Sequence, residues 1–387
     1  MQPIYILYEA RLRDNLRRIR VVADEAGVDI ILALKAYALW KTFPVISEYV
    51  HATTASSPNE ARMAHEYFGT LTHTYSPAYE PSTFAEILSH SSHVTFNSLA
   101  QYVRFLPDVL LYNEHAQQGV HIGLRVNPLH SPVQTALYNP CVADSRLGIP
   151  YTLLPQTLPA HVSGLHVHCL CESSAADSAR AIAVVRERLR PWLGQVSWLN
   201  LGGGHLMTAA GYDTPLLVGA LKQLRVEWPR LRVILEPGSA FLWGAGDLFA
   251  TVVDIVDNGP SFVPTAILNV SPACHMPDTL EQPYTPPVKG ATPCCVDALP
   301  QNVRGGETVY YLGGNSCLAG DRIGPYRFEQ PLHRGDAVVI QDQLHYTTVK
   351  THMFNGVQHP DIVFQREDGG RQLLRHFSYE DYLQRMD

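Results

Sequence analysis

A lysine at the end of an apolar run is the first residue in this sequence that could do chemistry. Lys35 follows the run IILAL and is one of only five lysines in the 387-residue chain, which has 24 arginines. One interpretation is a strand-end lysine that makes an ion pair. The other is an amine with a lowered pKa that forms a Schiff base with the carbonyl group of a cofactor or substrate.

Two glycine-containing turns follow later apolar runs. One run ends in Gly202-Gly203-Gly204, and the next ends in Glu236-Pro237-Gly238-Ser239. Glycine exposes backbone N–H groups, which suit an anion such as phosphate, although glycines are also typical of tight turns. Glu236 adds a carboxylate beside the second turn, or it is a solvated strand end.

The segment HVHCLCE, residues 166–172, is dense in side chains that bind metals. Alternate residues of a strand share a face, so His166 and His168 are predicted to point one way and Cys169 and Cys171 the other. Such a set does not converge on one ion without a bend. A zinc site therefore stays as a less favoured alternative.

The second half of the chain contains a further candidate loop, GGNSCLAGD, at residues 313–321. Cys317 and Asp321 are either ordinary loop residues or, respectively, a proton donor and a binder of a cationic group. Tyr346 lies in the segment HYT, which precedes FNG at residues 354–356. The simplest interpretation of these aromatic residues is a packed strand.

A repeating order of elements must position these residues. Eight β-rich runs alternate with amphipathic helical segments, at residues 29–35, 51–56, 71–76, 93–98, 121–127, 164–170, 195–204 and 231–238. Alternation of this kind indicates parallel strands with helical crossovers, and eight units close a barrel; the alternative is an open doubly wound sheet. The sequence predicts an α/β protein with a parallel (β/α)8 TIM-like barrel, whose active site lies at the carboxyl ends of the strands.

After about residue 240 the pattern changes to strand-like runs separated by proline and glycine, namely DLFATVVDIVD, TAILNVS, TVYYLGG and DAVVIQD. The sequence predicts a barrel over residues 1–240, from which a first strand at about 1–9 could join the second domain, and a β-rich domain over 241–387. The two domains are expected to pack closely, since no long linker separates them.

Composition restricts the class of protein. Hydrophobic residues make up 46% and charged residues 17%, which supports a buried core. The formal charge is −7 without a lysine and arginine cluster, so a nucleic-acid partner is not expected. No apolar run reaches the ~20 residues of a membrane helix, and the seven cysteines do not indicate a disulfide framework, so a cytoplasmic protein is expected.

The chain resembles the fold-type III pyridoxal-phosphate enzymes, the group of alanine racemase and the ornithine and diaminopimelate decarboxylases. A closer resemblance is to the carboxynorspermidine (carboxyspermidine) decarboxylases. It rests on segments that occur in order along the chain, namely ALKAYA, TASSPNEA, HTYSPAY, SHVTFNSLAQ, YNPC, SRLG, HVHCLCE, LNLGGGH, LEPGSA, CHMPDTLEQPY, GNSCLAGD and HYTTVKTHMFNG.

The resemblance implies pyridoxal 5'-phosphate as the cofactor, bound to Lys35 through a Schiff base. It implies that His166 stacks on the pyridine ring and that the phosphate is bound by Gly202, Gly203, Gly204, Gly238, Ser239 and Tyr346. Glu236 would contact the ring nitrogen and keep it protonated, which favours decarboxylation because the ring can then accept an electron pair. Racemases of the group have an arginine there.

The resemblance also implies a homodimer, in which Cys317 of one chain protonates the product in the site of the other. Ornithine decarboxylases have an aspartate immediately after that cysteine, where this chain has Leu318, so Asp321, Asp278 and Glu281 are the candidates for binding the substrate amine. His168 and Cys169 replace a glycine and a serine of those enzymes.

The expected activity is decarboxylation of carboxynorspermidine or carboxyspermidine in polyamine biosynthesis. The alternatives are a decarboxylase of diaminopimelate, ornithine or arginine, and a non-catalytic barrel protein that binds the same cofactor.

Overall fold

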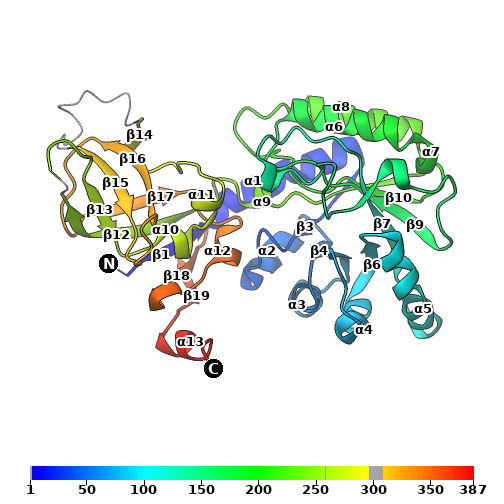
Figure 1. Cartoon of the computed structure of the whole chain (residues 1–387), viewed down its shortest axis with the longest axis horizontal. Helices are drawn as coiled ribbons and strands as arrows, with labels where there is room; N and C mark the ends of the chain where they lie inside the picture. The colour runs from blue at the N-terminus through cyan, green and yellow to red at the C-terminus, as the bar shows by residue number, and fades with distance from the viewer. Residues whose placement is uncertain (1, 258, 296–307) are drawn as a thin grey trace. The chain divides into compact units, whose positions relative to one another are not determined.

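The computed structural model describes residues 2–257, 259–295 and 308–387, which form two compact units (Figure 1). One unit is Arg13–Phe241, and the other combines Met1–Leu12 with Leu242–Asp387. The boundary near residue 241 lies close to the predicted one, and the amino-terminal segment belongs with the carboxy-terminal half.

The first unit is the predicted parallel barrel. Its sheet order is β2-β11-β10-β9-β7-β6-β5-β4-β3, and β2 and β3 are two parts of one strand interrupted at Ile31. The ring closes because β2 pairs with β11 while β3 pairs with β4, so the barrel is confirmed and the open sheet is wrong. The strands are β2 (Asp29–Ile30), β3 (Leu32–Ala33), β4 (Thr53–Ala55), β5 (Thr72–Tyr75), β6 (Ser91–Phe96), β7 (His121–Asn127), β9 (Val162–His166), β10 (Trp198–Asn200) and β11 (Arg232–Leu235), with β8 (Ile149–Pro150) paired to β7.

Helices follow the barrel strands, as the alternating pattern predicts. Serine side chains begin three of them: the Ser57 hydroxyl accepts from the Glu60 N–H, and Ser98 and Ser174 cap α5 and α6 in the same way. Helices α6 and α8 lie side by side (Figure 1). The helices of this part are α1 (Glu9–Ala26), α2 (Phe43–Ser47), α3 (Pro58–Met63), α4 (Pro81–Ser89), α5 (Leu99–His115), α6 (Ala175–Arg188), α7 (Arg190–Leu193), α8 (Thr214–Glu227) and α9 (Ser239–Leu242).

Ring contacts between strands that are not sheet neighbours identify the barrel interior. The His93 and Trp198 ring centroids, on β6 and β10, are 5.2 Å apart, and the Tyr75 and His166 centroids, on β5 and β9, are 5.4 Å apart. The indole of Trp198 lies against Gly123 and Gly164, where a Cβ atom would come within 2.3 Å and 1.8 Å of it. These glycines leave room for a large ring in the core.

Three histidines form a row across neighbouring strands near their amino-terminal ends. His73 on β5 is in register with His93 on β6, which is in register with His121 on β7. The first two rings stack with centroids 3.8 Å apart, and both are buried. We call these three residues the histidine row.

The second unit is a mostly antiparallel sheet of order β14-β16-β15-β13-β12-β1-β18-β19, with β17 paired to β12. Strand β1 pairs with β12 and β18, so the first strand of the chain is part of this sheet. Its strands are β1 (Ile4–Tyr8), β12 (Gly246–Val256), β13 (Thr265–Leu268), β14 (Ala291–Pro293), β15 (Val309–Gly313), β16 (Arg322–Phe328), β17 (Ala337–Gln341), β18 (Asp361–Gln365) and β19 (Arg371–Arg375), and its helices are α10 (Pro272–His275), α11 (Asp278–Glu281), α12 (Thr347–Lys350) and α13 (Tyr379–Leu383). Over the described ranges, no helix combines the length and the apolar character that a bilayer crossing requires.

Candidate functional site

Polar side chains gather at the carboxyl ends of neighbouring barrel strands. Strand register aligns Arg125 of β7 with His166 of β9, and His166 with Asn200 of β10. Glu236 directly follows β11, and Lys35 lies in the turn after β3. The barrel end therefore brings together a guanidinium, an imidazole, an amide, a carboxylate and an amine.

Glu236 is a buried carboxylate held by its neighbour. The Asn200 side-chain amide donates to Glu236 Oε1 at 2.5 Å. Burial raises the pKa of Glu236, and this outweighs the lowering by the Asn200 hydrogen bond and by the Lys35 charge. Glu236 is thus suited to holding or sharing a proton with a bound group.

The Lys35 side chain is exposed at the barrel end, but the protein groups that surround its amine reduce the hydration of the charged form. This desolvation is the main cause of the lowered pKa of Lys35. The Glu236 charge opposes it, and the Arg125 charge adds to it. A lowered pKa increases the neutral fraction of the amine, which is what a nucleophilic lysine requires.

His166 presents a buried, neutral imidazole to the same space. Burial, followed by the Arg125 and Lys35 charges, brings the pKa of His166 well below its ordinary value. Its Nε2 atom lies 3.7 Å from Glu236 Oε2 and has no hydrogen-bond partner within the described chain. A buried polar atom without a partner indicates a place where a ligand belongs.

The segment after His166 differs from the prediction. Strand β9 ends at His166, so the predicted alternation of faces through Cys171 is wrong. His168 instead accepts the Gly203 N–H at Nδ1, 3.0 Å away. In the part of the chain that the structure describes, no three histidine, cysteine or acidic side chains are arranged to hold a metal ion.

The glycine turn after β10 is required by packing. The Gly202 N–H donates to Asn200 Oδ1 at 2.8 Å and the Gly203 N–H donates to His168, so the prediction that both offer free N–H groups is wrong. A Cβ atom on Gly203 would lie 2.3 Å from the Glu236 carbonyl oxygen, and one on Gly204 would lie 2.5 Å from the Leu170 backbone. These glycines let the turn pack closely against its neighbours.

The turn after β11, at residues 236–239, is hydrogen-bonded to the segment after β9. Ser239 is buried and donates its hydroxyl to Glu172 Oε1 at 2.8 Å. Gly238 directly precedes α9, which begins at Ser239. The Ser239 hydroxyl therefore has a carboxylate acceptor within the barrel.

Asp321, predicted to bind the substrate amine, lies buried in the sheet unit and organises its own loop. It accepts the Ser271 hydroxyl at 2.7 Å, the Ala273 N–H at 2.8 Å and the Ser316 hydroxyl at 2.6 Å. These donors satisfy both carboxylate oxygens. The geometry supports a structural role for Asp321 in place of the predicted one.

Asp278 and Glu281, the other predicted substrate carboxylates, lie on α11 and both form ion pairs with Lys350 of α12. These carboxylates already have a cation from the same unit. The arrangement does not support their predicted role, and no local pattern in the sequence indicates that Lys350 contacts them.

Cys317 and Tyr346 lie in the sheet unit. Cys317 is exposed, and its N–H donates to Asn355 Oδ1 at 2.8 Å. Tyr346 has a left-handed backbone, with φ of 57°, directly before α12. The loop that contains Cys317 is therefore hydrogen-bonded to the turn at residues 354–356.

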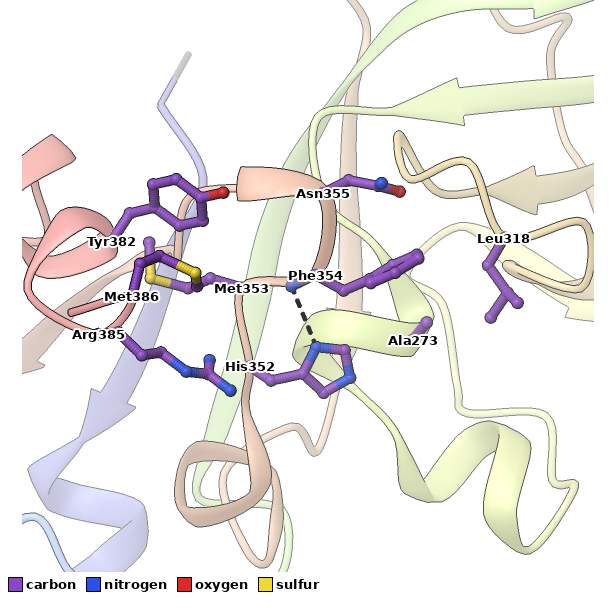
Figure 2. Close-up of a pocket in the computed structure, with 9 residues that line it drawn as sticks. All are labelled: Ala273, Leu318, His352, Met353, Phe354, Asn355, Tyr382, Arg385 and Met386. Atoms are coloured by element: carbon purple, nitrogen blue, oxygen red, sulfur yellow. Dashed lines mark hydrogen bonds between the residues drawn. The ribbon is translucent and has the colours of Figure 1, made fainter.

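That turn borders a cavity of about 630 Å³ within the sheet unit. Figure 2 shows the Phe354 ring directed toward Leu318, next to Cys317 in sequence, and the Arg385 side chain directed toward His352. The lining residues are Ala273, Leu318, His352, Met353, Phe354, Asn355, Tyr382, Arg385 and Met386. The loop that contains Cys317, the candidate proton donor, thus contributes Leu318 to a concave, largely apolar surface.

Arg125 is a site residue that the sequence analysis missed. It occurs in the strand segment GLRVN, and nothing in that segment indicates a buried cation. In the fold, Arg125 is only 5% exposed. Only the register with His166 brings it into the site.

Comparisons with known proteins show which proteins this chain resembles. No family model matches the chain. The sequence is 43% identical to the carboxyaminopropylagmatine decarboxylase of Synechocystis sp. over 99% of this chain and 95% of that protein. It is 39% identical to the carboxynorspermidine/carboxyspermidine decarboxylase of Campylobacter jejuni over 98% of this chain and 97% of that protein.

Solved structures give the same picture. The crystal structure of the Campylobacter jejuni carboxynorspermidine decarboxylase complexed with norspermidine matches with a TM-score of 0.87 and 36% identity, over 100% of both chains. The diaminopimelate decarboxylase of Helicobacter pylori matches with a TM-score of 0.80 at 14% identity, over 100% of this chain and 97% of that one, which shows a shared fold.

Proposed function

Because this chain belongs to the carboxynorspermidine/carboxyspermidine decarboxylase family, we propose that it removes CO2 from carboxynorspermidine or carboxyspermidine. The observation that carries the proposal is the end-to-end similarity to these decarboxylases, with an amine, an imidazole and a carboxylate converging at one barrel end. The chain is a decarboxylase of polyamine biosynthesis, and the products would be norspermidine or spermidine.

The cofactor that fits this site is pyridoxal 5'-phosphate. The buried His166 Nε2 without a partner, the accessible Lys35 amine of lowered pKa and the Glu236 carboxyl of raised pKa support it. When bound, the cofactor supplies an aldehyde for the substrate amine and a ring that accepts the electron pair left by CO2. Lys35 would hold the aldehyde, and His166 would pack on the ring.

Glu236 would hold a proton at the ring nitrogen, oriented by the hydrogen bond from Asn200 to its other oxygen. Gly202, Gly203, Gly204, Gly238 and Ser239, with Tyr346, would surround the phosphate. The Gly202 and Gly203 N–H groups and the Ser239 hydroxyl have acceptors inside the protein, so the phosphate would depend most on the remaining donors of this set.

Borohydride reduction tests the cofactor assignment. It fixes the cofactor covalently to the lysine that carries it, and peptide mapping should then find the pyridoxyl group on Lys35. A Lys41→Ala variant is the matched control and should keep the label. A pyridoxyl group on another lysine, or on none, would contradict the assignment.

Cys317 would return a proton to the carbon that loses CO2. A second copy of the chain would supply this cysteine to each site. The exposed thiol and the adjoining cavity of the sheet unit support such a shared site. Mixing inactive Lys35→Ala and Cys317→Ala proteins should restore activity, up to about a quarter of the wild-type value, because a mixed dimer contains one intact site. No recovery after subunit exchange would refute the shared site.

Carboxyaminopropylagmatine is a second candidate substrate, since the relative named for that activity has 43% identity to this chain. The two substrate classes differ at the far end, because agmatine carries a guanidinium where spermidine has an amine. Comparing kcat/KM on carboxyspermidine, carboxynorspermidine and carboxyaminopropylagmatine decides between them. The low identity of the diaminopimelate and lysine/ornithine decarboxylases gives those activities no comparable support.

A further inference from the structure

Asn97 is a polar residue at the barrel end to which the proposed function gives no role. It directly follows β6, and its side-chain amide makes three hydrogen bonds. Asn97 Oδ1 accepts the Tyr75 hydroxyl at 2.8 Å and the Gly148 N–H at 2.7 Å. Its Nδ2 donates to the Arg146 carbonyl oxygen at 2.9 Å. One amide thus joins the end of β5 to the loop that follows β7.

The start of α5 fixes the position of Asn97. Ser98 is the N-cap residue of this helix, and its hydroxyl accepts the Gln101 N–H at 3.0 Å. The Gln101 side chain in turn accepts the Asn97 N–H at Oε1, 2.6 Å away. The arrangement resembles a capping box, in which two side chains of the first helical turn satisfy backbone N–H groups. The helix therefore holds the amide in place before a ligand binds.

The Tyr75 side chain connects Asn97 to the centre of the site. The Tyr75 ring stands nearly perpendicular to the His166 ring, with centroids 5.4 Å apart and an interplanar angle of 89°. The Arg125 guanidinium carbon lies 4.5 Å from the centroid of the same Tyr75 ring. Within the described residues, no hydrogen bond at His166 Nε2 sets the orientation of the imidazole. The contact with the Tyr75 ring restrains it instead, in the perpendicular geometry that aromatic pairs favour.

We infer that Asn97 is a positioning residue for His166 and acts through Tyr75. This inference rests on the proposed function, in which the cofactor ring packs on His166. An imidazole that is already held in one orientation presents its face to the cofactor without a further loss of conformational freedom on binding. Without the Asn97 amide, the Tyr75 ring and the imidazole are free to turn, and binding must then order both.

A double-mutant cycle on cofactor binding tests this inference. Asn97→Ala should bind pyridoxal 5'-phosphate about 3- to 10-fold more weakly than wild type, the loss expected for one aromatic contact. Tyr75→Phe, which keeps the ring but removes its hydrogen bond to Asn97, should reproduce this loss. In a His166→Ala background, Asn97→Ala should cause no additional loss, because the imidazole that it positions is absent.

Affinity is measured by titrating the cofactor-free proteins and following absorbance, which requires no turnover. Asn113→Ala is the matched control and should keep the wild-type affinity. The Asn113 side chain also makes two hydrogen bonds, to the backbone of Val120 beside the amino-terminal end of β7. At saturating cofactor, the circular dichroism of the cofactor absorption band should differ between Asn97→Ala and wild type, a measurement that does not need the His166→Ala background.

The possible outcomes separate a positioning role from a structural one. Equal losses for Asn97→Ala in the wild-type and His166→Ala backgrounds would show a general structural role and overturn the inference. An unchanged affinity, or an unchanged circular dichroism band, would also overturn it. If wild type did not bind pyridoxal 5'-phosphate at all, the proposed function itself would fail.

Discussion

Acid should destabilise this protein through His73 and His93, two members of the histidine row. Burial lowers the pKa of His73 to about 3 and that of His93 to about 2, with smaller contributions from neighbouring charges. In the unfolded chain a histidine titrates near 6.5. Above that pH both states are neutral. As the pH falls below it, the unfolded state binds protons that the folded state excludes, and stability decreases until the pH reaches the folded pKa.

The size of the effect follows from these values. At pH 5.0, protonation of the unfolded chain lowers the free energy of unfolding by about 2 kcal/mol for each histidine, relative to pH 7.5. His73 and His93 together therefore contribute about 4 kcal/mol to the loss. A double His73→Gln, His93→Gln variant should lose about 4 kcal/mol less than wild type between the two pH values.

Urea unfolding at pH 7.5 and 5.0 measures this difference. Any destabilisation by the substitutions at neutral pH cancels, because each protein is compared with itself. His51→Gln, at an exposed position outside the row, tests whether removing any histidine has the same effect. If the double variant and wild type lose equal stability over this range, the two histidines do not stay neutral in the fold and the reasoning is refuted.

Three further predictions concern Glu236 of the site, Asp321 of the sheet unit and Gly203 of the glycine turn. Glu236→Gln should reduce the decarboxylation rate by about 10²- to 10⁴-fold, because the amide cannot hold a proton at the ring nitrogen; a variant with the full wild-type rate would contradict that role. Asp321→Ala should lower the free energy of unfolding by about 2–4 kcal/mol, because it leaves the Ser271, Ala273 and Ser316 donors unsatisfied, and a changed KM with unchanged stability would restore the substrate role. Gly203→Ala should lower the thermal midpoint of the protein in calorimetry, because its Cβ would lie 2.3 Å from the Glu236 carbonyl oxygen, and an unchanged midpoint would show that the turn relaxes at no cost.

The barrel could be predicted because its signal is local and repeated. Each of the eight apolar runs overlaps a barrel strand, and Ser57 caps the helix that follows the second of these runs. In the sheet unit, β12, β13, β15 and β17 coincide with the four predicted runs, whereas β14, β16, β18 and β19 lie outside them. Strand β14 has three residues and β16 contains a proline and a glycine, so neither carries a clear alternating pattern.

The site could be predicted only in part, because hydrogen-bond partners are set by the tertiary structure. Lys35, His166 and Glu236 stand at strand ends, and a barrel brings all strand ends to one side, so their convergence follows from the order of elements. The partners of Asp321 come from residues 271, 273 and 316, and no local pattern reports such contacts. Arg125 was missed for the same reason, since its role depends on register with a distant strand.

The account depends most directly on release of CO2 from a carboxylated polyamine. Purified protein supplied with pyridoxal 5'-phosphate should release CO2 from carboxynorspermidine or carboxyspermidine and yield the corresponding triamine, while Lys35→Ala should release none. Release from diaminopimelate, ornithine or arginine alone, with both carboxylated polyamines left intact, would contradict it.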